Sequence, residues 1–102
     1  FIKERIEKYG AVYCIGDARA ILVKVGWTIY PAYRLKTLQC ASPYELMIHA
    51  LMPGSRDLER EVHESFADRR IRGEWFDNED GEIVGTFEEV YALMASGAVR
   101  DA

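Results

Sequence analysis

Cysteines and long apolar runs are both scarce in this sequence. It contains only two cysteines, Cys14 and Cys40, and their wide separation fits neither a zinc-binding pair nor a CxxC redox motif. We therefore expect two reduced thiols, as in a cytoplasmic or nucleoid-associated protein. No run of about 18 apolar residues occurs, so we expect no contact with a membrane. The charged start of the chain also does not have the form of a signal peptide.

Positive net charge is lacking as well, because the formal charge is −4. This balance argues against a surface that is basic throughout, as a protein that coats nucleic acid would have. It leaves room for a local basic face, since the placement of the charges decides binding. Basic residues are concentrated at 69–72, with Lys24, Arg34 and Lys36 upstream, and acidic residues are concentrated at 74–80.

An initial methionine is also missing, because the sequence begins at Phe1. We interpret residues 1–102 as a single domain taken from a longer protein that has other domains. With 49% hydrophobic and 29% charged residues, a chain of this length can bury a core without disulfides or metal ions.

The spacing of apolar residues predicts alternating helices and strands. Thr86 and Glu89 have the form of a capping box that would open the last helix, and Ser55 or Asp57 can cap an earlier one. The order predicts an α/β (α+β) domain with a small three-stranded sheet and helices packed against it. The predicted elements are helices at 2–8, 32–39, 57–69 and 87–96 and strands at 11–16, 20–26 and 44–52.

Several polar residues and glycines follow one another in a characteristic order. They are Tyr13 in the first strand, Lys24 and Gly26 in the second, Arg34, then Glu59, His63 and Arg70, and finally Gly73-Glu74-Trp75-Phe76. This set resembles the GIY-YIG endonuclease family, in particular its phage-type branch with the pattern KIGxT, an arginine, ExxxH and GEWF. The resemblance covers about residues 11–77. It implies a three-stranded antiparallel sheet flanked by helices and hydrolysis of DNA with one Mg²⁺ or Mn²⁺ ion.

The resemblance also implies a role for individual residues. Tyr13 corresponds to the general base, Arg34 to the arginine on the phosphate, and Glu59 to the metal ligand. Lys24 and Gly26 stand at the tyrosine and glycine of YIG. The remaining candidates are His63, for phosphate contact or proton relay, and Trp27, Lys36, Arg70 and Glu74, as substrate-binding or auxiliary residues.

These roles agree with the chemistry of phosphodiester hydrolysis, which needs an activated water and neutralisation of charge on the phosphate. A carboxylate such as Glu59 is a hard oxygen ligand suited to Mg²⁺. Arg34 can bind two phosphate oxygens at once and stays charged at any working pH. A tyrosine has a reference pKa of about 10, and we expect a nearby Lys24 cation to lower the pKa of Tyr13.

Each of these residues also has a purely structural interpretation. Tyr13 in a buried strand is commonly a core residue, and Lys24 could protect an exposed sheet edge from aggregation. The charged residues on the helices could form solvated faces. Trp75 and Phe76 could pack in the core rather than stack on bases.

The sequence departs from the family pattern at a few positions. Ala11 replaces the glycine of GIY, and Leu38 stands where many members carry His or Tyr. A later asparagine of the family has no clear counterpart. Two functions therefore remain open: a DNA endonuclease module of a phage or mobile element, acting as a monomer or a homodimer, and a catalytically weak or inactive module that binds nucleic acid or protein. The nuclease interpretation requires the cations to gather around Glu59: Lys24, Arg34, Lys36, Arg70 and Arg72.

Overall fold

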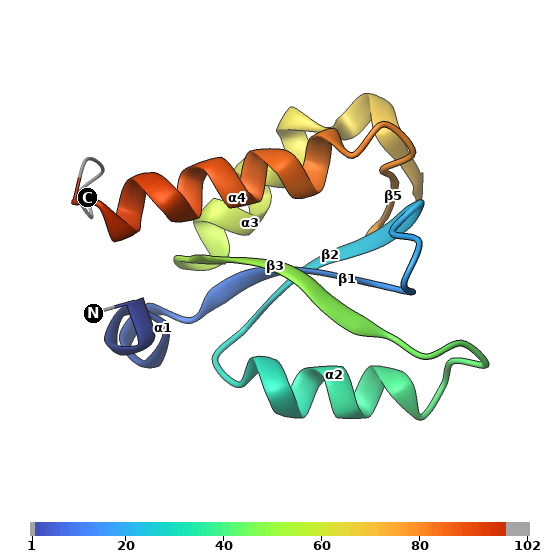
Figure 1. Cartoon of the computed structure of the whole chain (residues 1–102), viewed down its shortest axis with the longest axis horizontal. Helices are drawn as coiled ribbons and strands as arrows, with labels where there is room; N and C mark the ends of the chain where they lie inside the picture. Colours follow the sequence, from blue (N-terminus) through green and yellow to red (C-terminus); the bar gives the residue numbers. More distant parts are fainter. Residues whose placement is uncertain (1, 98–102) are drawn as a thin grey trace.

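The centre of the sheet forms from the apolar runs near the start of the chain. In the computed structural model, which describes residues 2–97, β1 (Ala11–Gly16) and β2 (Leu22–Thr28) make an antiparallel hairpin (Figure 1). β3 (Met47–Pro53) pairs with the other side of β1. Every residue of β1 is buried, because the strand has a neighbour on each side and helices over both faces.

Two short strands extend the sheet beyond the three that the sequence predicts. β4 (Arg70–Arg72) and β5 (Trp75–Asp77) form a hairpin, and β5 pairs with β2. The sheet is antiparallel with the order β3-β1-β2-β5-β4. The predicted α+β class is thus confirmed. The predicted number of strands, three, was too low, because the sheet has five. Strands of three residues with charged members are too short to show an alternating apolar pattern.

The two faces of the sheet have different partners. Val12, Cys14, Val23 and Val25 belong to the core that also contains Phe76 and side chains of α3 (Arg56–Ser65) and α4 (Glu82–Ala95). The residues that alternate with these on β1 and β2, such as Tyr13 and Ile15, point to the other face of the sheet. That face is covered by α2 (Pro31–Gln39) (Figure 1). None of the residues of α2 is buried. α1 (Ile2–Tyr9) contacts β3.

The internal position of β2 settles one interpretation of Lys24. β2 lies between β1 and β5, so Lys24 does not protect a sheet edge. The predicted role as an edge lysine is therefore wrong. The edge on this side is the short, charged strand β4, which itself offers little to a further strand.

The ends of two helices differ from the prediction. Ser55 caps α3 as predicted, since its side chain accepts from the Asp57 N–H, but the helix ends at Ser65 and a 3₁₀ turn (Ala67–Arg69) follows. α4 begins at Glu82, which places Thr86 inside the helix, so the predicted capping box is wrong. The sequence pattern was present without the backbone conformation that a cap requires.

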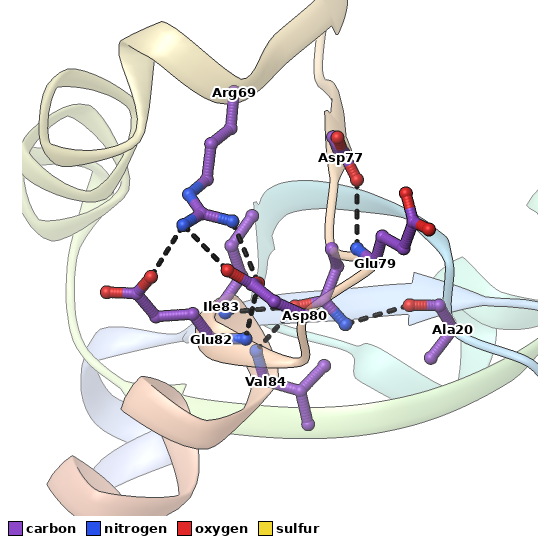
Figure 2. A network of polar contacts seen from close by, with 9 residues as sticks. Ala20, Arg69, Asp77, Glu79, Asp80, Glu82, Ile83 and Val84 are labelled. Atoms are coloured by element: carbon purple, nitrogen blue, oxygen red, sulfur yellow. Dashed lines mark hydrogen bonds and ion pairs between the residues drawn. The ribbon is translucent and has the colours of Figure 1, made fainter.

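Asn78 takes over the capping of α4. Its Oδ1 accepts from the N–H groups of Ile83 (2.9 Å) and Val84 (3.3 Å), and its Nδ2 donates to the Ala20 carbonyl (2.8 Å). Figure 2 shows these contacts beside an ion-pair network. There Arg69 contacts Asp80 (2.8 Å) and Glu82 (2.6 Å). The turn before α4 is thereby tied both to the β1–β2 loop and to the end of the 3₁₀ segment.

Both cysteines are free, as expected. Cys14 is buried in the core, and burial raises the pKa of its thiol, whereas Cys40 is exposed. Within residues 2–97, no helix combines the length and apolarity needed to cross a bilayer. Phe1 and residues 98–102, at the ends of the predicted domain, lie outside the described residues.

Candidate metal and phosphate site

Tyr13 lies on β1, an internal strand of the sheet, and faces α2. It stands opposite Gly26 on β2, and its side chain is only 1% exposed. A Cβ atom at residue 26 would overlap the Tyr13 hydroxyl and ring. Gly26 is therefore needed for the position of the Tyr13 ring, which gives the predicted pair of residues a direct steric link.

Arg34 reaches Tyr13 from α2. Its Nε donates to the Tyr13 hydroxyl oxygen at 3.2 Å. This helix begins at Pro31, whose fixed φ suits the first helical turn. A tyrosine on the sheet and an arginine on the helix, well separated in the sequence, are thus brought together.

The pKa of Tyr13 is raised rather than lowered. Burial is the main cause, because it disfavours the charged phenolate. The hydrogen bond and charge of Arg34 act in the opposite direction, and the carboxylates of Glu74 and Glu59 raise the pKa further. The expectation that Lys24 lowers the pKa of Tyr13 is therefore wrong.

Lys24 has a different partner. Its Nζ makes an ion pair with Glu74 Oε1 at 3.1 Å and lies 5.8 Å from the centroid of the Trp75 ring. The Glu74 carbonyl accepts from the Val25 N–H at 2.9 Å, which fixes the β4–β5 turn beside β2. The ammonium group thus neutralises a carboxylate at the site instead of acting on the tyrosine.

Glu59, His63 and Glu74 form the one group of possible metal ligands among the described residues. One ligand atom from each lies within 4.8 Å of the others. Glu59 and His63 are four residues apart on α3, which places them on the same face, and Glu74 approaches from the β4–β5 turn. Two carboxylates with one imidazole suit a divalent cation such as Mn²⁺ and are compatible with Mg²⁺. The sequence indicated Glu59 as the ligand and did not predict that Glu74 would join it.

His63 is engaged at both ring nitrogens. Its Nε2 lies 2.8 Å from the Val25 carbonyl, and its Nδ1 lies 3.2 Å from Arg70 Nη2. Because the carbonyl only accepts and the guanidinium only donates, Nε2 carries the proton and Nδ1 is the acceptor. A backbone carbonyl on one ring nitrogen is also the usual support of a metal-bound histidine. Only Nδ1 has a lone pair for a cation, so a ligand role for His63 requires Arg70 to give up its contact with this nitrogen.

The cations converge on this region only in part. Arg34 contacts Tyr13, Lys24 contacts Glu74, and Arg70 contacts His63. Lys36 instead lines a surface hollow with Gln39 and Glu45, and Arg72 is exposed on the edge strand β4. Two arginines that the sequence did not single out, Arg56 and Arg60, line a groove on α3 with Glu59 and His63.

Trp27 has a structural position next to this groove. Its indole Nε1 donates to the carbonyls of Gly54 (2.8 Å) and Tyr9 (3.3 Å), and Arg56 lies over its ring at 4.7 Å. The tryptophan therefore joins β2 to the end of α1 and to the residue after β3, and it supports Arg56 by a cation–π contact.

The fold and the grouping of Glu59, His63, Glu74, Tyr13 and Arg34 define a small α+β domain with a possible divalent-cation site. Residues 10–94 of the 102 match the family model described as the T5orf172 domain, and the chain belongs to this phage-associated, nuclease-related family. No curated protein and no solved structure matches the chain.

Proposed function

We propose that this domain is a metal-dependent DNA endonuclease of the GIY-YIG type. The observation that carries the proposal is the grouping of Glu59, His63 and Glu74 within 4.8 Å. The charges of Glu74 and Glu59 also act on Tyr13, which is hydrogen-bonded to Arg34. Membership of the T5orf172 family supports a nuclease-like or DNA-binding role in general. The ordered GIY-YIG motifs support the more specific activity.

Each side chain has a distinct task in the proposed hydrolysis. Glu59 and Glu74 would hold the cation with His63. When bound, such a cation polarises the phosphate and favours ionisation of a water molecule. Arg34 is placed to bind the phosphate oxygens that gain charge during the reaction. The groove that holds Arg56 and Arg60 is suited to neighbouring phosphates.

Tyr13 is the proposed general base. Since burial raises its pKa, its hydroxyl keeps its proton at neutral pH, so Tyr13 acts as a base only in the fraction of molecules that have lost this proton to solvent. Arg34 favours this ionised form, whose phenolate oxygen accepts the proton of the attacking water. Arg34 thus serves both the phosphate and the tyrosine.

A plasmid-nicking assay with Mg²⁺ or Mn²⁺ tests this proposal. We expect a chelator to abolish nicking, and Glu59→Gln and Arg34→Ala each to reduce its rate by about 10² or more. Glu61→Gln is the matched control, because it makes the same change of charge on the exposed side of the same helix. Nicking that persists in chelator, or that survives in both site variants, would overturn the assignment.

Metal binding can be measured separately from activity. A bound ion stabilises the folded state in proportion to the logarithm of its concentration over its Kd. Mn²⁺ should therefore raise the Tm of the unsubstituted protein and of Glu61→Gln, but not of Glu59→Gln. A rise in Tm without nicking would instead favour the second candidate, an inactive DNA-binding module, for which Leu38 and the engaged nitrogens of His63 are the supporting observations.

A further inference from the structure

A pocket of about 570 Å³ lies next to the Tyr13–Arg34 pair, between the end of α2 and the sheet. We call it the Leu38 pocket, after the residue at which the sequence departs from the family pattern. Its wall is mainly apolar and aromatic. Its principal lining residues are Ile15, Lys24, Leu38, Tyr44, Leu46 and Trp75.

The Leu38 pocket continues the candidate site by one step along each element. Residues two apart on a strand share a face, so Ile15 follows Tyr13 on β1 and Lys24 follows Gly26 on β2. Leu38 lies one turn beyond Arg34 on α2. A group bound in the pocket would therefore lie directly beside a phosphate held by Arg34.

We propose that the Leu38 pocket binds an unpaired nucleobase of the DNA strand that is cut; this inference rests on the proposed function. A base is joined to its phosphate through one sugar, so a strand held at Arg34 must place a base nearby. A paired base remains in the duplex stack, whereas an extruded base can enter a pocket with aromatic and apolar walls. The volume lies within the range that encloses small organic ligands.

The polar residues at the pocket also suit a nucleotide. Lys24 lines its inner wall and offers positive charge towards a polyanion, although Glu74 shares that charge. Asp17 and Arg19, paired at 2.9 Å, line it as well and provide both an acceptor and donors for the edge of a base. In this arrangement Leu38 supplies an apolar wall where a histidine or tyrosine would bring a polar group.

Tyr44 supplies a ring for stacking. The loop that carries it is fixed through the backbone, because its carbonyl accepts from Ser42 Oγ (2.9 Å) and Gln39 Nε2 (2.8 Å). The side chain itself is 62% exposed. Replacement of the ring therefore leaves these hydrogen bonds intact. Tyr33, which is 67% exposed and does not line this pocket, is a matched control.

The test compares binding of two labelled duplexes that differ only in one unpaired, bulged nucleotide, measured by fluorescence anisotropy in chelator so that nothing is cut. We expect the bulged duplex to bind at least about fivefold more tightly, as one stacked base would provide. Tyr44→Ala and Leu38→Ala should remove this preference, and Tyr33→Ala should keep it.

Equal binding of the two duplexes would overturn the assignment of the pocket, as would an equal loss in Tyr33→Ala. The same duplexes in Mg²⁺ or Mn²⁺ separate this result from the proposed function. A bulge preference without nicking supports the pocket and contradicts the nuclease. Nicking without a bulge preference supports the nuclease and contradicts the pocket.

Discussion

At the scale of single residues, the Tyr13 ring occupies the space that a side chain at residue 26 would need. Gly26→Ala would place a Cβ atom against the Tyr13 ring, which is buried on the internal strand β1. Because the ring has little room to move, we expect a loss of about 1–3 kcal/mol in the free energy of unfolding. Nicking should fall with it, since the displaced hydroxyl loses its register with Arg34. Denaturant titration measures the first effect and plasmid nicking the second.

Gly85→Ala is the control for this change. Gly85 lies within α4, and an added Cβ atom there meets nothing within 4 Å. Alanine at a helix position of this kind stabilises by about 0.5–1 kcal/mol relative to glycine. The two glycine variants should therefore shift the unfolding midpoint in opposite directions. A shift of the same sign in both would contradict the steric explanation for Gly26.

At the scale of elements, the start of α4 depends on Asn78. Its side chain is buried and makes hydrogen bonds to Ala20, Ile83 and Val84. Asn78→Ala removes the helix cap and leaves buried backbone groups without partners, so we expect a loss of about 2–4 kcal/mol in thermal or denaturant unfolding. Glu79→Ala, at the exposed neighbouring position, should stay within about 0.5 kcal/mol. Similar losses in the two variants would show that Asn78 has no special role.

The elements that the sequence predicted well are those with long, regular apolar patterns. β1, β2 and α3 were placed from local patterns alone, because burial of many apolar residues determines them. β4 and β5 were missed because these three-residue strands depend on pairing with each other and, for β5, with the distant strand β2. The start of α4 was missed because the cap is a hydrogen bond from Asn78, while Thr86 matched a motif without being a cap.

The candidate site, too, was only partly predictable from the sequence. The order of Tyr13, Arg34 and Glu59 was readable from motifs, and the structure brings Arg34 to Tyr13. The partner of Lys24, the grouping of Glu74 with Glu59, and the direction of the Tyr13 pKa shift were not readable. Each depends on burial and on contacts between segments far apart in the sequence.

At the scale of the whole molecule, a net charge of −4 is combined with a small basic region. Lys24 is paired with Glu74, and Arg60 is paired with Asp57. About three cations, Arg34, Arg56 and Arg70, are then left near the site to replace counterions on DNA. The logarithm of the DNA-binding constant should therefore fall with the logarithm of salt concentration with a slope of only about −3.

Two variants locate the region that binds DNA. Arg56→Ala should make the slope shallower by about one, because it removes one phosphate contact. Lys36→Ala, in a separate hollow on α2, should leave it unchanged. A steep slope, or the opposite order of these two effects, would show that DNA lies on another face.

The low burial of α2 has a consequence for the motions of the molecule. This helix carries Arg34 yet contains no buried residue, whereas every residue of β1 is buried. Lifting α2 from the sheet would expose Tyr13 and Ile15 beneath it but no buried residue of α2 itself, so local opening should cost less free energy there than in β1. We therefore expect α2 to open locally while the hairpin that holds Tyr13 stays folded.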